Sequence, residues 1–408
     1  MHSAAKLQGP KRGCNRAPLE EMRQYRYSAA ALSDRLMVMS RHFIRHWAAI
    51  ITAVAVAPNC LADDRLLAAS DLVHVGSFNI AAADREGFGY GGTAIAFNPA
   101  NRSLFIVGIE TQYQTAEITI PPISGTANLL QPFTDSLHGA LGKIGDGELR
   151  IGGNLVYRDK LYVSGFLFYD AAAAQRQSHF SRSLTLSDGA IVGPTRVGRL
   201  GAGFYSGYMG LIPAAWQARL GGPALTGNCC LSIITRTSFG PAAFAFDPEN
   251  LGDARPLVYY TSDRQTLGRY GDRGPNPAFN GSTRITGIVF PEDTASVLFF
   301  GMTGIGPYCY GEAAECGDPI NPYKGEHAPP YRAWVWAYDA NDLAAVSNRR
   351  ERPWDVIPYA TWELEDLGDV SANFGIGGAA YDAAEQRIYV SKKYGDGDRP
   401  SIEVYEIR

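Results

Sequence analysis

One sequence motif recurs along the chain and constrains its fold more than any other feature. A glycine-rich segment precedes a strand of small apolar and aromatic residues. A turn with Pro, Asp or Asn follows, and then a second strand rich in β-branched and aromatic residues. The motif occurs at residues 91–108, 152–165, 240–261, 286–301 and 377–391. Because such a hairpin cannot bury both of its faces alone, the copies must stack against one another.

A third strand of alternating residues follows several copies, at 116–120, 334–338 and 402–407. Irregular repeats of three or four strands predict an all-β fold, a β-propeller. The glycines fit its innermost strands, which crowd around a central channel. Five hairpins predict five blades, and the long intervals between some copies leave six or seven blades as the alternative. A β-sandwich or a two-domain all-β protein is the competing architecture.

The two ends of the repeat region fit closure of a ring. Residues 402–407 end the chain as one strand and residues 72–80 form another, so we expect the two to complete one blade and hide its open edges. Loop insertions are expected near 199–235 and 304–332. On these hairpins, most of residues 72–408 resemble secreted bacterial β-propeller proteins. The resemblance implies a fold and transfers no catalytic residue, since propellers have unrelated functions.

Residues 37–62 are typical of a secretory signal peptide. A positively charged stretch at 41–46 precedes an apolar run at 47–58 (WAAIITAVAVAP), and small residues before an acidic pair place the cleavage point near Ala62. The apolar run has about a dozen residues, which is short of the ~20 that span a bilayer.

We therefore expect residues 1–62 to be an upstream extension with a signal peptide. Residues 63–408 would then form a single exported propeller domain, periplasmic or extracellular, with no transmembrane segment. An N-terminal membrane anchor, a buried helix or lipidation at Cys60 are the alternatives. A start of translation at Met37 or Met39 is a further hypothesis.

Charge and motifs exclude several classes of function. The chain carries 37 Lys and Arg against 41 Asp and Glu, a net charge of −4, so it has no electrostatic footprint for nucleic acid. It has no Gly-x-Ser-x-Gly elbow, phosphate loop or dinucleotide fingerprint on a strand–helix turn. These absences argue against an α/β-hydrolase, a nucleotide enzyme and a Rossmann dehydrogenase.

Four cysteines follow the predicted cleavage point: Cys229, Cys230, Cys309 and Cys316. An even number in an exported chain indicates disulfides. Two pairings are open. Either Cys309 bonds to Cys316 while the adjacent Cys229 and Cys230 form a vicinal disulfide, or each member of one pair bonds to a member of the other. No Cys-x-x-Cys or His-x-x-x-His spacing supports a zinc site.

Propeller sites usually lie on loops at one mouth of the channel, so loops with charged and aromatic residues are the candidates. A carbohydrate hydrolase needs two carboxylates about 5–10 Å apart, one of them protonated at the working pH. Glu110, Asp263 and Glu326 are the candidate catalytic carboxylates because they lie on comparable loops.

The candidate ligand-binding residues are aromatic and charged side chains of the same loops. Tyr rings would stack on sugars, and cations would bind hydroxyl or acidic groups. These residues are Arg236, Arg264, Tyr270, His327, Tyr331, Arg332, Lys392 and Tyr394. The plainer interpretation of each residue is a solvated loop side chain. Cofactors are unknown, with calcium at the Asp396-Gly397-Asp398 turn as a hypothesis.

The sequence thus favours an exported propeller that binds a carbohydrate, another small polar ligand or a protein partner at its channel mouth. The alternative is a carbohydrate-active hydrolase or lyase that uses the carboxylates of the mouth.

Overall fold

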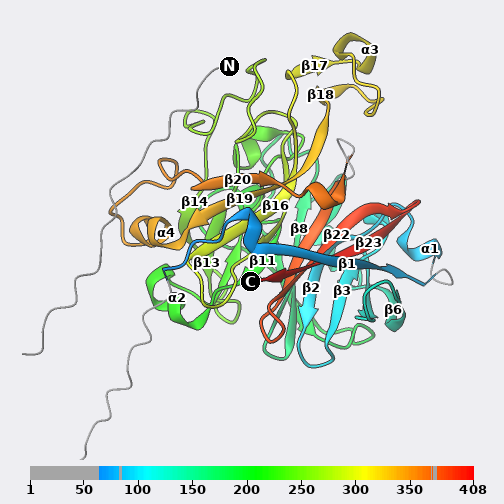
Figure 1. Ribbon diagram of the computed structural model, residues 1–408. Helices are drawn as coiled ribbons and strands as arrows, with labels where there is room; N and C mark the ends of the chain where they lie inside the picture. Colours follow the sequence, from blue (N-terminus) through cyan, green and yellow to red (C-terminus); the bar gives the residue numbers. More distant parts are fainter. Residues whose placement is uncertain (1–63, 82–84, 369, 371–374) are drawn as a thin grey trace, which may run out of the picture. The chain divides into compact units, whose positions relative to one another are not determined.

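Five four-stranded antiparallel arrangements form the blades in the computed structural model, which describes residues 64–81, 85–368, 370 and 375–408 (Figure 1). The predicted signal peptide and upstream extension lie outside the described residues. The first blade is β2 (Thr93–Asn98), β3 (Ser103–Val107), β4 (Gln114–Thr119) and β6 (Leu129–Asp135). The second is β7 (Leu149–Tyr157), β8 (Lys160–Leu167), β9 (His179–Ser183) and β10 (Ile191–Thr195).

The third and fourth blades follow the same order along the chain, and the fifth takes its fourth strand from the N-terminal part of the repeat region. The third is β11 (Met209–Leu211), β12 (Ala224–Thr226), β13 (Ala243–Phe246) and β14 (Arg255–Val258). The fourth is β15 (Arg284–Val289), β16 (Ser296–Gly304), β19 (Tyr331–Asp339) and β20 (Ala360–Glu363). The fifth is β21 (Ile376–Asp382), β22 (Arg387–Asp396), β23 (Arg399–Ile407) and β1 (Leu72–Ile80), with β5 (Thr126–Ala127) parallel to β1. The five-bladed prediction is therefore confirmed.

Closure of the ring is confirmed as well. β1 pairs antiparallel with β23 from Leu72 opposite Ile407 to Asn79 opposite Ser401, so both ends of the repeat region build the fifth blade. The inner strands β2, β7, β11, β15 and β21 each contact the next, and β21 contacts β2. Since the fifth blade joins the two ends of the repeat region, the ring is fastened by hydrogen bonds along two whole strands.

The glycine-rich segment of the repeat coincides with a β-bulge on the inner strand. The pairing register shifts between Ile151 and Gly153 in the second blade and between Ile376 and Gly378 in the fifth. A Cβ added at Gly152 or Gly377 would lie 1.9 Å from a backbone oxygen of the neighbouring blade. Only glycine permits this approach, which explains the repeated motif.

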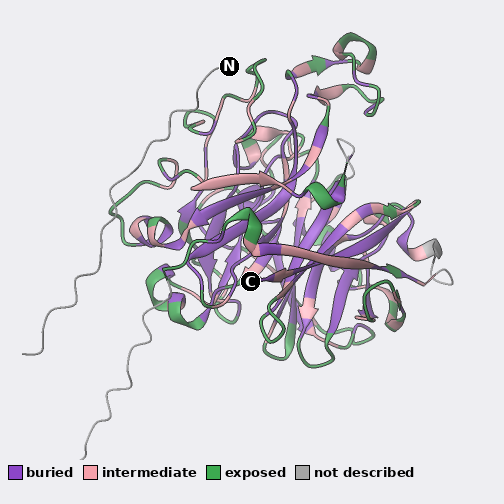
Figure 2. Cartoon of the chain, in the orientation of Figure 1, coloured by how far each residue is buried: buried purple, intermediate pink, exposed green. Residues whose placement is uncertain are grey.

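The hydrophobic core is divided among the gaps between blades. Each of five buried clusters lies between two neighbouring blades. Strands such as β3, β8, β16 and β23 are buried along most of their length, whereas the outermost strands β6, β10 and β20 are mostly half-buried (Figure 2). Polar side chains link neighbouring blades across the gaps. Asn154 Nδ2 donates to Ala94 O at 2.8 Å, and Ser391 Oγ donates to Gly92 O at 2.6 Å. The blades therefore depend on one another for their burial.

The third blade requires a correction. The motif at 240–261 forms the outer hairpin of this blade, β13 and β14. The inner strands β11 and β12 lie inside the segment 199–235, which was expected to be an insertion. Helix α2 (Ala214–Leu220) joins these two strands, with Trp216 buried. The three-residue inner strands are too short for an alternating pattern, which is why the sequence did not distinguish them.

The segment 304–332 leaves the fourth blade between β16 and β19. Its residues 305–330, called the arm below, contain β17 (Cys309–Gly311), α3 (Ala313–Cys316) and β18 (Gly325–His327) and project from the blades (Figure 1). The remaining helices are the short α1 (Arg85–Phe88) before β2 and α4 (Ala340–Ser347) after β19. Among the described residues, no helix is both long and apolar enough to cross a bilayer.

Candidate functional site

One end of the ring gathers the predicted site residues, and it is called the mouth face. At this end, each inner strand begins and the second strand of the same blade ends. The antiparallel pairing of Leu149 with Leu167 and of Arg284 with Met302 shows this arrangement. All predicted site residues lie on loops or strand ends at this face. The distribution follows from the topology, because the loops that link one blade to the next also lie at this end.

Glu110 joins three blades. It begins the 3-10 turn Glu110–Gln112 after β3, and its Oε1 accepts from Lys393 Nζ of β22 at 2.8 Å while Oε2 lies 3.4 Å from Arg150 Nε of β7. Burial raises the pKa of Glu110, but the two cations outweigh burial and hold it below its ordinary value. The group Glu110, Arg150 and Lys393, called the Glu110 cluster, therefore keeps an ionised carboxylate at the mouth.

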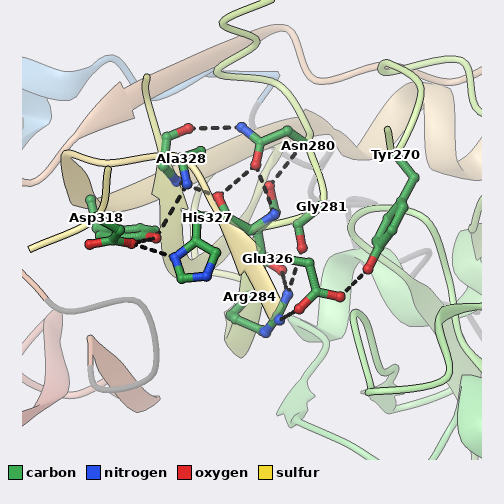
Figure 3. Close-up of polar contacts among 12 residues, drawn as sticks. Tyr270, Asn280, Gly281, Arg284, Asp318, Glu326, His327 and Ala328 are labelled. Atoms are coloured by element: carbon green, nitrogen blue, oxygen red, sulfur yellow. Dashed lines mark hydrogen bonds and ion pairs between the residues drawn. The ribbon is translucent and has the colours of Figure 1, made fainter. Parts of the chain in front are cut away.

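Glu326 joins the arm to the loop between the third and fourth blades (Figure 3). Its Oε1 accepts a hydrogen bond from the Tyr270 hydroxyl, and its Oε2 lies 3.4 Å from Arg284 Nη2. Arg284 begins β15 and also donates to the Gly281 carbonyl at 3.0 Å. Burial and the Glu326 charge raise the pKa of Tyr270, so the phenol stays a donor. These three side chains, Glu326, Arg284 and Tyr270, form the Glu326 cluster.

His327 and Tyr331 hold the arm from within. His327 is fully buried, with Nδ1 2.9 Å from Asp318 Oδ2 and Nε2 3.1 Å from the Gly311 carbonyl, and the Tyr331 hydroxyl donates to the same Asp318 oxygen at 2.5 Å (Figure 3). Both side chains face Asp318 instead of solvent. On β18, successive residues alternate, so His327 points inward and Glu326 toward the mouth.

Asp263 lies apart from both clusters. Its side chain is 71% exposed, accepts from Thr261 Oγ1 at 2.6 Å and lies 3.7 Å from Arg264. The Thr261 hydrogen bond lowers the pKa of Asp263. A cavity of about 550 Å³ beside it is lined by residues 262–272, including Tyr270 and Asp272. Tyr270 thus borders this cavity while it donates to Glu326.

The remaining predicted residues pair with nearby groups. Arg236 donates to the Asp170 and Ala171 carbonyls, Arg332 to the Tyr331 carbonyl, and Lys392 to the Leu367 carbonyl. Arg264 lies over the Trp354 ring at 5.9 Å. Burial and the nearby Tyr90, Glu110 and Tyr323 raise the pKa of Tyr394 to about 12.

The three candidate carboxylates have separate partners. Among the described residues, no hydrogen bond or ion pair joins any two of Glu110, Asp263 and Glu326, and each has its own partners. Within the same residues, no three or more His, Cys, Asp and Glu side chains gather as metal ligands. At the turn considered for calcium, Asp396 pairs with Arg399 at 2.6 Å.

Four tyrosines at the mouth face were not among the predicted ligand-binding residues. Tyr90, Tyr169, Tyr310 and Tyr323 are 61–64% exposed, and no other tyrosine among the described residues is as open. Tyr90 packs edge-on against Tyr394 at 5.8 Å. An available signal was their loop position, since Tyr90 stands between glycines and Tyr310 between Cys309 and Gly311.

Both disulfides are local. Cys229 is bonded to Cys230 and Cys309 to Cys316, which is one of the two pairings left open by the sequence. The first pair is buried in the third blade. The second closes the tip of the arm around α3, so it supports the element that carries Glu326.

Comparisons with known proteins show no family and only remote structural likenesses. No protein-family model matches the chain, and no curated protein matches its sequence. Among solved structures, an endo-arabinanase of family GH43 from Bacillus licheniformis has 11% identity and a TM-score of 0.42, covering 80% of this chain and 95% of that one. A luciferin-regenerating enzyme has 9% identity and a TM-score of 0.36, covering 79% and 92%.

A gluconolactonase from Xanthomonas campestris has 12% identity and a TM-score of 0.31, covering 82% of this chain and 93% of that one. At such identities and TM-scores, none of these likenesses carries an argument about function. The function has to be argued from the residues at the mouth.

Proposed function

We propose that the protein is an exported binding protein whose mouth face takes a carbohydrate. The observation that carries the proposal is that four tyrosines, 61–64% exposed, lie at the same end of the ring as the Glu110 and Glu326 clusters. Tyrosine faces stack on sugar rings, while guanidinium, ammonium and carboxylate groups bond sugar hydroxyls. The signal-like residues 37–62 and the two disulfides support export to an oxidising compartment.

The charge states of the carboxylates favour binding over hydrolysis. A glycosidase of the usual kind needs one protonated carboxyl group at its working pH. The pKa values of Glu110 and Asp263 are both below their ordinary values, so both groups are ionised near neutral pH. The lowered pKa values disfavour Glu110 and Asp263 as the general acid.

Substitution of the exposed tyrosines tests the proposal. A panel of oligosaccharides is screened first by melting shift, and the best ligand is titrated by calorimetry. Tyr323→Ala and Tyr90→Ala are each expected to weaken binding about five- to tenfold, since a stacking aromatic contributes about 1 kcal/mol. Leu211→Ala is the control, because Leu211 is exposed at the opposite end of the channel. A loss in the control with unchanged tyrosine variants would contradict binding at the mouth.

A hydrolase or lyase is the second candidate, because Asp263 and Asp272 line the same cavity as Tyr270. The test is release of reducing ends from a panel of polysaccharides, with digests also examined for unsaturated ends. We expect no release by the parent protein. Release that is lost in Asp263→Ala or Glu110→Ala would replace the binding proposal with the enzymatic one.

A further inference from the structure

A second cavity lies at the outer side of the third blade, and no residue of the two mouth clusters lines it. Its volume is about 1010 Å³. Four parts of the chain form it: the loop at 199–205, Gly221 after α2, the outer hairpin β13–β14 with its connection and Tyr259, and the end of α4 at 346–349. The size is at the upper limit of the range of small-molecule sites, about 300–1,000 Å³.

The floor of this cavity is apolar and aromatic. Tyr205, Phe244, Ala254 and Val346 are buried there. Tyr259 is half-buried and stacks on Phe244, with ring centroids 5.5 Å apart and planes 19° apart. The Tyr205 hydroxyl accepts from two backbone N–H groups of the 199–200 loop, at 3.1 and 3.0 Å, so this wall is held in place. Such a floor suits a flat ring.

The rim carries more positive than negative charge. Arg199, Arg255 and Arg349 line it together with Asp247 and Asp253. The Arg199–Asp253 pair is 4.0 Å apart and exposed, so it holds neither side chain firmly. Arg255 donates one N–H to Ser347 Oγ at 3.2 Å, which leaves other donors of its guanidinium for a ligand.

Arg349 stands where the backbone favours glycine. It follows the end of α4 with φ +58°, and its N–H donates to the Val346 carbonyl at 2.8 Å. Glycine is the usual residue at this left-handed position, because it lacks the Cβ that makes the conformation costly. No ion pair or side-chain hydrogen bond of Arg349 occurs among the described residues. The chain thus places an uncommitted guanidinium at the rim, on a backbone that glycine would fit better.

We propose that this cavity binds a small organic anion with a flat ring, such as an aromatic carboxylate or sulfonate. The ring lies on the Phe244–Tyr259 floor, and the anionic group takes hydrogen bonds from Arg255 and Arg349. The charge of the rim selects against cations, and the apolar floor selects against small inorganic anions. This site is independent of the carbohydrate proposal, since its residues and its ligand chemistry are different.

The test uses 8-anilinonaphthalene-1-sulfonate, whose fluorescence rises in an apolar site. The purified protein is expected to bind it saturably at one site, and Arg349→Gly is expected to weaken binding at least about fivefold. The same variant should keep or raise the melting temperature, which separates loss of a ligand contact from loss of the fold. Arg255→Gln should also weaken binding.

Arg102→Gly is the matched control, because Arg102 is an exposed arginine with φ +50° on the turn between β2 and β3, outside the cavity. It should leave the affinity unchanged, as should Tyr323→Ala at the mouth. The proposal is overturned by absence of saturable binding, by an unchanged affinity in Arg349→Gly, or by a loss of binding in either control.

Discussion

Phe78→Ala is expected to lower the free energy of unfolding by about 3–5 kcal/mol, because it removes a buried aromatic ring from the strand that closes the propeller. Phe78 is 1% exposed, pairs with Ile402 across β1 and β23, and lies edge-on to Tyr389 at 6.5 Å. Its cluster fills the gap between the fifth and first blades. Loss of this packing weakens the attachment of β1 and exposes the edge of β23.

Chemical denaturation followed by tryptophan fluorescence measures this effect. Val192→Ala is the control, since Val192 also lies on the outermost strand of a blade but is 66% exposed. Its free energy of unfolding should change by no more than about 0.5 kcal/mol. Equal denaturation midpoints for Phe78→Ala and the parent protein would mean that β1 does not hold the ring closed.

Asp318→Asn is expected to destabilise the arm by about 3–5 kcal/mol, because it breaks a buried charged network. The carboxylate accepts four hydrogen bonds, two from backbone N–H groups at 2.8 and 3.0 Å and two from His327 and Tyr331. Both ring nitrogens of His327 face oxygen acceptors, so the neutral amide leaves a buried donor poorly matched. The arm should become sensitive to proteolysis, and ligand binding should fall because Glu326 is adjacent to His327.

Glu312→Gln is the matched control on the same arm. Glu312 is exposed and lies 3.9 Å from Lys324, a surface pair worth at most about 1 kcal/mol. It should leave the rate of proteolysis near that of the parent protein. Equal protection of the arm in Asp318→Asn and Glu312→Gln would contradict a structural role for the buried network.

The same network predicts how the arm responds to acid. Burial raises the pKa of Asp318, but the hydrogen bonds from Tyr331 and His327 outweigh burial and hold it below its ordinary value of 3.8. A depressed folded-state pKa contributes stability that is complete above the unfolded value and is lost as the pH falls through the folded one. Protection of the arm should therefore persist at pH 5 and decline only below about pH 4.

The fold was largely predictable because the inner hairpins of the first, second, fourth and fifth blades combine long apolar strands with a β-bulge that contains or directly follows glycine. The third blade was not, since β11 and β12 have three residues each and its longest apolar run is β13 on the outer side. Ring closure was predictable because 72–80 and 402–407 both read as unpaired strands. A strand is recognisable from sequence when the segment is long enough and alternates apolar and polar residues. Both of these segments meet those conditions, so their pairing could be expected.

The site was only partly predictable. The sequence identified the loops of Glu110 and Glu326, but not their partners Lys393, Arg150 and Arg284. Those contacts cross from blade to blade, and each depends on the register after a bulge, as between Ile151 and Gly153. A one-residue shift would turn these side chains to the other face of the sheet. Likewise, a three-residue strand such as β18 does not reveal from sequence that His327 faces inward and Glu326 outward.

Hydrogen exchange of the protein with and without its best-binding oligosaccharide tests the central claim most directly. The account predicts slower exchange in the mouth loops near Tyr90, Tyr310 and Glu326, and no change at the opposite end of the channel near Leu211. Slower exchange near Leu211 with unchanged mouth loops would contradict it, and would place the ligand at the other end of the ring.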